Sequence, residues 1–500
     1  MITEQAVRSP DSAPRTAAVD RRRRLWWGVG AVLWLLAVHG RFDVAVAAWL
    51  FPVFLLRFTR TGPAASGLLL VWLASAVSGL FWMVETAVPM TVVTVVGIVA
   101  LTAVTALPFA LDRLVAPRAR VLLFPAALVA CEFLMTVVSP FGAAFGVLAP
   151  TQHDATALLQ VVGVTGPYGI AFLIGWFATT ANAVWADPAG WWRASRRFGL
   201  VLVLVLVGGG AVLALSPTSG PSVRVAGISP DTRVTDELRG LIGDDFTPRS
   251  VLDQDPALVR PEFAKVNANL FARTREAARA GARIVVWSEQ AANVLAADEP
   301  AFLAEAAATA RQKRIHLEVA VYLYLPDSPY TANRTYLFDP AGTRLWAYDK
   351  SHPVLGLESY PEGPGVVPVV DTPYGRLATV TCFDADFPAL TRVDADILLV
   401  PARDWPEVGS VHSGKAALRA VENGYSLVRQ AEFGVSGAVD RHGRVLASHD
   451  YAGSDVHVVH SDVPTHGVTT VYRVVGDLFA WLCVAGAVVT TGARLRRSRA

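Results

Sequence analysis

The sequence contains little cysteine: Cys131, Cys382 and Cys483 are the three in a chain of 500 residues. They are far apart and form no CxxC or CxxH spacing, so their pattern supports neither a disulfide framework nor a structural zinc site. Cys131 and Cys483 both fall inside long apolar runs. Cys382 is therefore the one cysteine in polar surroundings, and its thiol is the one that we expect to do chemistry.

A strong excess of charge is also absent. The formal net charge is +2, and the arginines form clusters at the ends of apolar segments rather than a basic stripe interleaved with aromatic residues. We therefore expect no nucleic-acid partner. In contrast, 53% of the residues are hydrophobic and the mean hydropathy is +0.40, which is high for a soluble protein. These values predict a membrane component.

Long apolar runs are frequent in the first 216 residues. A helix needs about 20 mostly apolar residues to cross the hydrocarbon core of a bilayer. Seven stretches approach this length before residue 217, and an eighth lies near the C-terminus. We expect membrane helices at residues 25–39, 43–58, 64–84, 89–111, 120–138, 163–186, 198–216 and 474–492.

The placement of arginine predicts the orientation of these helices, because Lys and Arg are retained in cytoplasmic loops. Arginines precede the first segment, occupy every second loop after it, and follow the eighth segment, whereas the other loops carry little charge. We therefore expect both termini in the cytoplasm and the region from about residue 217 on the outer face of a bacterial cell membrane. The arginines are Arg21 to Arg24, Arg57, Arg60, Arg113, Arg118, Arg120, Arg193, Arg196, Arg197, Arg494, Arg496, Arg497 and Arg499.

These patterns predict four parts of the chain. They are a cytoplasmic tail (1–24), a membrane domain of about seven helices (25–216), an extracytoplasmic domain (217–470), and a transmembrane helix with a basic tail (471–500). An alternative is that residues 25–39 form a cleaved signal peptide, since a basic start before a short apolar run also fits one. Six further apolar segments and the lack of an evident AxA site favour a membrane helix.

One ionisable residue lies deep inside a predicted membrane segment. Glu132 falls within residues 120–138, and a carboxyl group at membrane depth is a functional candidate by default. The alternative is a carboxyl that is hydrogen-bonded between helices and holds the bundle together. The sequence leaves both interpretations open.

From residue 223 to about 463, short β-branched runs alternate with Ala-rich amphipathic stretches. Strands separated by helices of this length predict a layered α/β fold with buried sheets, whose active residues lie at or beyond strand ends. We expect strands at 223–228, 284–287, 317–325, 335–339, 377–382, 397–401, 426–430, 434–439 and 456–460, and helices at 262–280, 300–314 and 414–424.

Three of these strand ends carry residues that suit a single site. The runs IVVWSE, AYDK and LATVTC end at Glu289, Lys350 and Cys382. A thiol is largely protonated at neutral pH, so a nucleophilic cysteine needs a neighbouring base or cation. A glutamate can accept its proton, and a lysine can stabilise both the thiolate and the oxyanion that forms on attack. Each residue alone is weak evidence, but together they form a complete set for acyl transfer.

The sequence motifs around these residues resemble the signature regions of the carbon-nitrogen hydrolase (nitrilase) superfamily, in the order Glu, Lys, Cys. The later words LRAVENGYSLVR at 418–429 and GVSGAVDRHGR at 434–444 are also similar to that superfamily. The resemblance implies an αββα sandwich over the whole soluble region, and hence a polytopic helical membrane domain joined to a nitrilase-like extracytoplasmic domain.

Within that superfamily the chain resembles the apolipoprotein N-acyltransferases, which have several helices before the nitrilase-like domain and one after it. The word LLQVVGVTGPYGIAFL at 158–173 looks like that family's sixth segment, and Glu132 lies where the family has a glutamate. Glu358, eight residues after Lys350, matches the family's second essential glutamate. Asp384 stands where the family has a glutamate after the cysteine, and is a supporting candidate.

The resemblance implies transfer of a fatty acyl group from a phospholipid to a diacylglyceryl-lipoprotein through a Cys382 thioester, with membrane lipids as further partners and no metal or organic cofactor. Some loops depart from the family: its Trp-Pro-Glu is Trp287-Ser288-Glu289 here, and its Asn-Asp-Ala-Trp-Phe-Gly region reads ARDWPEVG at 402–409. The stretch from Glu358 to Cys382 is compact, as in soluble amidases. A membrane-anchored amidase acting on a small amide therefore remains an alternative, and a catalytically idle membrane scaffold is a second one that the intact triad disfavours.

Overall fold

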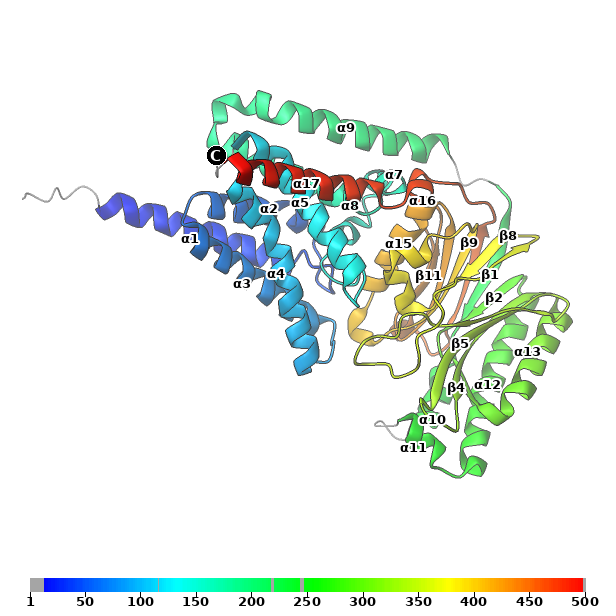
Figure 1. Ribbon diagram of the computed structural model, residues 1–500. Helices are drawn as coiled ribbons and strands as arrows, with labels where there is room; N and C mark the ends of the chain where they lie inside the picture. The colour runs from blue at the N-terminus through cyan, green and yellow to red at the C-terminus, as the bar shows by residue number, and fades with distance from the viewer. Residues whose placement is uncertain (1–12, 116, 217–219, 243–246, 498–500) are drawn as a thin grey trace, which may run out of the picture.

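The computed structural model describes residues 13–115, 117–216, 220–242 and 247–497. A helical domain occupies one side of the molecule and an α/β domain the other (Figure 1). The first part of the predicted N-terminal tail (1–12), the predicted domain boundary at residue 217 and Arg499 lie outside the described residues. The proposed division into four parts therefore stays a prediction.

The helical domain consists mainly of long apolar helices. By length and composition, five described stretches can cross a membrane, namely Ala64–Glu85, Val92–Leu114, Arg120–Val138, Tyr168–Ala186 and Pro188–Leu215. The long helices are α1 (Ala13–Leu35), α2 (Ala45–Arg60), α3 (Ala64–Glu85), α4 (Val92–Leu114), α5 (Pro117–Val138), α8 (Tyr168–Ala186), α9 (Trp191–Leu215) and, from the C-terminal end of the chain, α17 (Leu478–Arg497).

Several predicted helix boundaries differ from the structure. The helix expected to begin at residue 198 begins at Trp191. The first helix ends at Leu35, so residues 36–44 form a connection outside it. The single helix expected at 163–186 is interrupted at Gly166, which has a φ of +64° and separates α7 (Val162–Thr165) from α8. Gly476, with a φ of +60°, likewise separates α16 (Val471–Val475) from α17. Apolar composition could not show the breaks at Gly166 and Gly476, because they depend on backbone conformations that glycine adopts easily.

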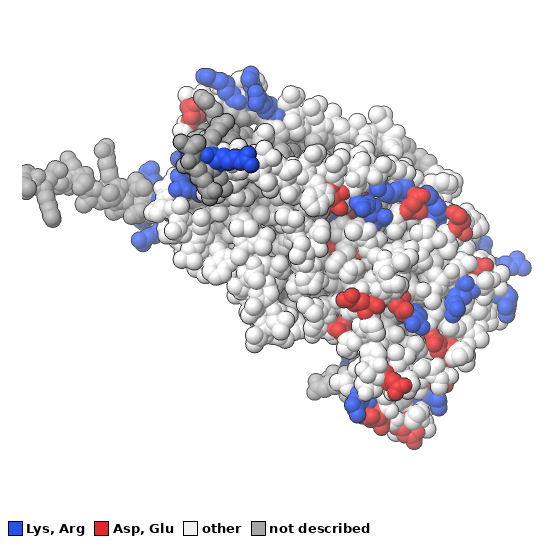
Figure 2. Space-filling view, in the orientation of Figure 1, with Lys and Arg blue, Asp and Glu red and all other residues white. Residues whose placement is uncertain are grey.

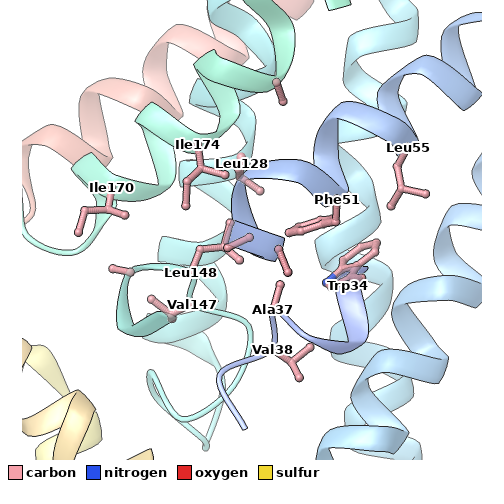
Figure 3. Packing of buried hydrophobic residues seen from close by; sticks show 14 of the residues in the cluster. Trp34, Ala37, Val38, Phe51, Leu55, Leu128, Val147, Leu148, Ile170 and Ile174 are labelled. Carbon is pink, nitrogen blue, oxygen red and sulfur yellow. The ribbon is translucent and has the colours of Figure 1, made fainter. Parts of the chain in front are cut away.

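Large side chains from several helices form the core of the helical domain (Figure 3). The rings of Trp34 and Phe51 stack with their centroids 4.8 Å apart. Nearer the helix ends, Arg60 forms a bidentate ion pair with the fully buried Asp112, with distances of 2.7 and 2.9 Å. Packing and polar contacts together hold α1, α2, α4 and α5 in one bundle.

The α/β domain contains two twisted sheets. One has the strand order β13-β1-β2-β4-β5-β6, with β3 also paired to β4, and the other has the order β12-β11-β10-β9-β8-β7. The strands are β1 (Ser222–Ile228), β2 (Ile284–Trp287), β3 (Ala292–Leu295), β4 (His316–Tyr324), β5 (Thr331–Phe338), β6 (Arg344–Asp349), β7 (Val369–Thr372), β8 (Gly375–Thr379), β9 (Ile397–Arg403), β10 (Ser426–Glu432), β11 (Val435–Val439), β12 (Val445–Asp450) and β13 (Val458–Pro464).

Helices cover the outer faces of both sheets, so the domain has four layers. Residues such as Ile284 and Val286 from one sheet and Leu377 and Leu399 from the other share a buried core between the sheets. The helices α10 (Thr232–Ile242), α11 (Pro248–Leu252), α12 (Pro256–Arg279) and α13 (Glu299–Lys313) lie on the side of the first sheet, and α14 (Pro388–Thr391) and α15 (Val411–Asn423) on that of the second. This arrangement confirms the αββα sandwich.

The strand directions bring several strand ends to one edge of the sandwich. In the first sheet β1, β2 and β4 are parallel, and β6 returns to the same direction after the antiparallel β5. In the second sheet β8, β9 and β10 are parallel. The backbone N–H of Glu289, just beyond β2, donates to the carbonyl of Ala402 in β9 at 3.2 Å, so the two sheets meet directly at this edge.

The same edge contacts the helical domain. The backbone N–H of Ala143, after α5, donates to the carbonyl of Asp386 at 2.7 Å. The indole N–H of Trp405 donates to the carbonyl of Thr86 at the end of α3. The described parts of the two domains therefore form a joined structure rather than two bodies linked only by chain.

Close packing of α5 against α8 generates a stability prediction. A Cβ added at Gly175 would lie 2.8 Å from the Cα of Pro125, whereas a Cβ at Gly210 in α9 would meet no atom within 4 Å. Because overpacking typically costs about 1 to 3 kcal/mol, Gly175→Ala should lower the free energy of unfolding by about that amount in a denaturant titration of the detergent-solubilised protein. Gly210→Ala is the matched control and should leave stability unchanged or slightly raised; equal stability of the two variants would contradict the packing.

Candidate active site

Cys382 lies in a tight turn beyond β8. The strand predicted to continue to residue 382 ends at Thr379, and Cys382 instead begins a short 3₁₀ helix, η5 (Cys382–Asp386). Its φ of +49° is uncommon for a residue with a side chain. Backbone strain of this kind clusters at functional sites, where the surrounding structure holds it in place. The turn directs the thiol toward the carbonyl of Arg403, to which it donates at 3.6 Å.

The carboxylate of Glu289 accepts three hydrogen bonds at the meeting point of the two sheets. Oε1 accepts from the ammonium of Lys350 at 2.9 Å and from the amide of Asn333 at 2.6 Å. Oε2 accepts from the backbone N–H of Arg403 at 2.9 Å. The residue is 1% exposed. Donors from β5, β9 and the end of β6 thus hold this carboxylate beside the Cys382 thiol, with which it interacts.

Lys350 is buried between two carboxylates. Its Nζ lies 2.9 Å from Glu289 and 2.9 Å from both oxygens of Glu358. Glu358 is itself held by the backbone N–H of Val354, which donates to it at 2.6 Å. The side chain of Lys350 has no exposed surface. The structure therefore brings together Glu289, Lys350, Glu358 and Cys382, the four residues that the sequence placed in one site.

Burial and charge set the protonation preferences of these groups. Burial is the largest influence on Glu289 and raises the pKa of its carboxyl, against the opposing effect of Lys350. Burial also disfavours the Lys350 ammonium, but Glu289, Cys382 and Glu358 raise its pKa well above the usual lysine value. The pKa of the Cys382 thiol is raised by burial and by Glu289, while Lys350 lowers it. These shifts favour the protonated thiol of Cys382 and the ammonium form of Lys350.

Asp384 is hydrogen-bonded to groups at two of the strand ends that form the site. Its carboxylate accepts from the hydroxyl of Tyr348 at 2.7 Å and from the backbone N–H groups of Ser351, His352 and Thr381 at 3.2, 2.7 and 3.2 Å. It is fully buried. Because it bonds the turn before the cysteine and the residues after the candidate lysine, it links the two strand ends that carry them.

Glu132 lies elsewhere. It is buried in α5 and lines a separate small cavity of about 30 Å³ with Trp34, Phe51 and Phe145. It is not among the residues that line the cavity around Cys382. The structure therefore does not bring Glu132 to the other candidate residues, and both interpretations of its carboxyl remain predictions.

Three participating residues were missed from the sequence. Asn333 in β5 donates to Glu289 and also to the hydroxyl of Tyr360 at 3.0 Å, and Arg403 contributes its backbone N–H. The ring of Tyr360 lies 5.9 Å from the Lys350 ammonium. Asn333 and Arg403 could have been found from their places in the predicted sheets. Asn333 lies in the strand paired with β6, which ends just before Lys350, and Arg403 ends a strand parallel to β8.

A cavity of about 660 Å³ opens from these residues toward the helical domain. The α/β domain contributes Glu289, Lys350, Glu358 and Cys382 to its wall. The helical domain contributes residues from α3, α4 and the segments beside them, most of them apolar. These residues are Trp82, Thr86, Val88, Pro89, Thr94, Ile98, Phe141 and Ala144. The candidate nucleophile, base and cation thus face a large, mainly apolar space, which suits acyl transfer from a lipid-like substrate.

Comparisons with known proteins match both domains. The family described as "Carbon-nitrogen hydrolase" matches residues 259–469, and the family described as "Apolipoprotein N-acyltransferase N-terminal domain" matches residues 29–180. A curated apolipoprotein N-acyltransferase from Geobacter metallireducens is 27% identical over 385 residues, which cover 70% of each chain. One from Bradyrhizobium diazoefficiens is 26% identical over 432 residues, covering 77% of this chain and 75% of that protein.

Among solved structures, an amidase from Nesterenkonia sp. is similar to part of the chain. It has 20% sequence identity and a TM-score of 0.39, and the match covers 49% of this chain and 92% of that one.

The protonation preferences predict how the reactivity of Cys382 depends on pH. As the pH falls through the pKa of Glu289, the base is lost; because burial raises that pKa, the loss begins above the ordinary glutamate value of about 4.3. The alkylation rate of Cys382 by iodoacetamide, followed by intact-protein mass spectrometry in a Cys131→Ala/Cys483→Ala background, should therefore fall with decreasing pH in that range.

Removing the base should slow the same reaction. We expect Glu289→Gln to lower the alkylation rate at neutral pH by about 100-fold or more, the lower range of general-base effects. Glu262→Gln, on the outer helix α12, is the matched control and should react at the wild-type rate. An unchanged rate in Glu289→Gln would show that Glu289 is not the base.

Proposed function

Because the chain belongs to the apolipoprotein N-acyltransferase family, a membrane branch of the carbon-nitrogen hydrolase superfamily, we propose that it transfers a fatty acyl group from a phospholipid to the N-terminal amine of a diacylglyceryl-cysteine lipoprotein. The chain is a membrane protein and an acyltransferase. The proposal assigns the chemistry to Cys382, Glu289 and Lys350, with Glu358 in support.

The observation that carries this function is the shared cavity. Its wall combines the candidate triad with apolar residues of α3 and α4, such as Trp82 and Ile98. Burying an acyl chain is favourable by about 0.8 kcal/mol per methylene group, so an apolar wall favours a lipid donor. A small amide would need neither this volume nor a wall built from membrane helices, which favours the acyltransferase over the amidase alternative.

In the first step, Glu289 removes the proton of Cys382 as the sulfur attacks the acyl ester carbonyl of the phospholipid. Lys350 and backbone amides stabilise the oxyanion of the tetrahedral intermediate. The intermediate collapses by breaking the carbon–oxygen bond, and the lysophospholipid leaves as an alcohol after taking the proton from Glu289. The acyl group remains on Cys382 as a thioester.

In the second step, the free α-amine of the diacylglyceryl-cysteine attacks the thioester carbonyl. Glu289 accepts a proton from the amine, and the same oxyanion stabilisation applies. Collapse breaks the carbon–sulfur bond and returns the proton to the sulfur of Cys382, which restores the resting thiol. No step uses a metal or an organic cofactor.

Glu358 and Asn333 position these groups. Glu358 binds the Lys350 ammonium through both oxygens and so orients it, and it is also a candidate to orient the incoming amine. Asn333 holds one oxygen of Glu289. The second oxygen of Glu289 accepts from the backbone N–H of Arg403. In this proposal the same oxygen carries the proton that moves between the sulfur, the alcohol and the amine.

The position of several arginines at one end of the helical bundle supports the proposed orientation. Arg57 packs over the rings of Trp26 and Trp185, and Arg60 binds Asp112. Figure 2 shows basic side chains at the end of the helical domain that lies away from the α/β domain. Arginine and tryptophan are enriched at the cytoplasmic interface and in interfacial belts respectively, so we propose that this end faces the cytoplasm and the α/β domain faces outward.

The thioester is the distinguishing species of the proposed mechanism. Purified protein incubated with phospholipid and without an acceptor should gain a mass equal to one fatty acyl group on Cys382, because a two-step transfer stores the acyl group between donor and acceptor. Intact-protein mass spectrometry checks this. An unmodified Cys382 together with rapid release of ammonia from small amides would favour the amidase instead.

Two sets of variants serve as controls for that experiment. Cys382→Ala should remain folded and gain no acyl mass, whereas Cys131→Ala/Cys483→Ala should gain it as the wild type does.

Ala144→Phe, which adds a ring to the cavity wall, should slow acylation by phospholipid but not alkylation by iodoacetamide. Ala280→Phe, at an exposed position, should affect neither.

The orientation can be tested by reporter fusions. A fusion near Gly342, in the turn between β5 and β6, should report an extracytoplasmic location. The arginines predict a cytoplasmic N-terminus, and an odd number of membrane crossings is expected before the α/β domain. Fusions at the two termini should report the cytoplasm. A cytoplasmic signal at Gly342 would contradict the proposed topology.

A further inference from the structure

Two histidines and an aspartate form a cluster where the domains meet. His39 and Asp43 lie in the connection between α1 and α2, and His153 follows the short helix η2 (Ala149–Gln152). One ring nitrogen from each histidine and a carboxylate oxygen of Asp43 lie within 4.8 Å of one another. None of the three lines the cavity around Cys382. The proposed acyl transfer does not use them.

The contacts of His39 are incompatible with a neutral ring on its own. Nδ1 lies 3.0 Å from Oδ2 of Asp43, and Nε2 lies 3.1 Å from the carbonyl oxygen of Val411. Both neighbours are acceptors, but a neutral imidazole has a single N–H. Either tautomer leaves a nitrogen lone pair facing an oxygen lone pair. A cation in one of the two contacts removes this conflict.

The position of that cation follows from the second contact. If Nε2–H donates to the Val411 carbonyl, the lone pair of Nδ1 faces Asp43. The other oxygen of Asp43, Oδ1, is buried and has no hydrogen-bond partner among the described residues. His39 is 4% exposed, so a cation bound at its Nδ1 would be shielded from solvent.

His153 repeats the same arrangement. Its Nδ1 lies 3.0 Å from the carbonyl oxygen of Pro150, so Nδ1–H donates there and Nε2 keeps its lone pair. Histidines that bind a metal through one nitrogen almost always donate the other N–H to a carbonyl or carboxylate, which fixes the tautomer. His39 and His153 each have such a backbone carbonyl, those of Val411 and Pro150.

We propose that Nδ1 of His39, Nε2 of His153 and the carboxylate of Asp43 bind a zinc ion. Imidazole nitrogens with one carboxylate suit zinc, whereas magnesium and calcium prefer oxygen ligands alone. Zinc lies about 2.0 to 2.2 Å from such ligands, and tetrahedral geometry sets them roughly 3.3 to 3.5 Å apart. The three ligand atoms lie within 4.8 Å of one another, so their separations would adjust when zinc binds. A water molecule completes the four ligands, and the exposed carboxylate of Asp154, 3.5 Å from His153 Nε2, adds negative charge beside the site.

The site would join the two domains. His39 reaches α15 through the carbonyl of Val411, and the next residue, His412, lines the cavity and is bonded to Asp404 at 2.8 Å. A bound ion would hold two connections of the helical domain, residues 36–44 and 153–155, against the start of α15. The zinc ion is thus structural in this proposal and takes no part in the transfer steps.

Zinc binding to the full-length protein in detergent tests the proposal. Protein stripped with a chelator is titrated with Zn²⁺, and bound zinc is measured by mass spectrometry of the metal. The wild type should retain one tight zinc per chain and show a zinc-dependent rise in Tm. His39→Gln, His153→Gln and Asp43→Asn should each weaken zinc binding at least tenfold and lose the rise in Tm.

A matched variant and a spectroscopic probe separate binding at this cluster from binding elsewhere on the protein. His460→Gln, an exposed histidine of β13, should bind zinc as the wild type does. Co²⁺ in place of zinc should give the visible absorption of a tetrahedral site in the wild type and lose it in His39→Gln. The similar size of Asn and Asp makes Asp43→Asn informative even if a histidine variant fails to fold. Zinc retained equally by wild type and Asp43→Asn, or no tight zinc in the wild type, would overturn the proposal; the latter would mean that a proton occupies the His39–Asp43 contact.

Discussion

The buried ammonium of Lys350 is the interaction on which the arrangement of the candidate site depends. Removing a charge from water costs several kcal/mol, and losing one partner of a buried pair costs about 3 to 5 kcal/mol because a charge is left uncompensated. The Nζ of Lys350 lies 2.9 Å from both Glu289 and Glu358, whose carboxylates oppose its charge. Glu289 follows β2, and Glu358 lies in the loop after β6. The pairing of the strands in the first sheet therefore brings both carboxylates to the ammonium of Lys350.

Residues of the second sheet supply further contacts to the candidate site. The backbone of Arg403 in β9 binds both Glu289 and the thiol of Cys382, and Asp384 joins the turn of Cys382 to the residues after Lys350. Contacts from Trp405 to Thr86 and from Ala143 to Asp386 then hold this edge against α3 and the segment after α5. The candidate nucleophile Cys382 consequently faces an apolar cavity between the domains rather than open solvent.

Several features could be predicted because they depend on local or periodic patterns. The apolar runs indicated the long helices, the alternation of β-branched and amphipathic stretches indicated the α/β layers, and polar residues at strand ends indicated Glu289, Lys350 and Cys382. Other features could not be read this way. The breaks at Gly166 and Gly476 interrupt apolar runs without changing their hydropathy, and the turn at Cys382 replaces the last residues of a predicted strand. Asn333 and Tyr360 join the site only through sheet pairing and loop packing.

The sequence by itself determined that the protein has membrane helices, an α/β domain with an αββα resemblance, and a Glu, Lys and Cys at strand ends, because each of these is carried by hydropathy, by periodicity or by short words along the chain. Only the tertiary structure decided which hydrogen bonds join Glu289, Lys350, Glu358 and Cys382, that Glu132 lies in a different cavity, and that α3 and α4 supply the wall facing the thiol. It also decided that His39 and Asp43 lie beside His153. These are contacts between residues far apart in sequence, and they follow from how sheets pair and domains pack, which no local pattern encodes.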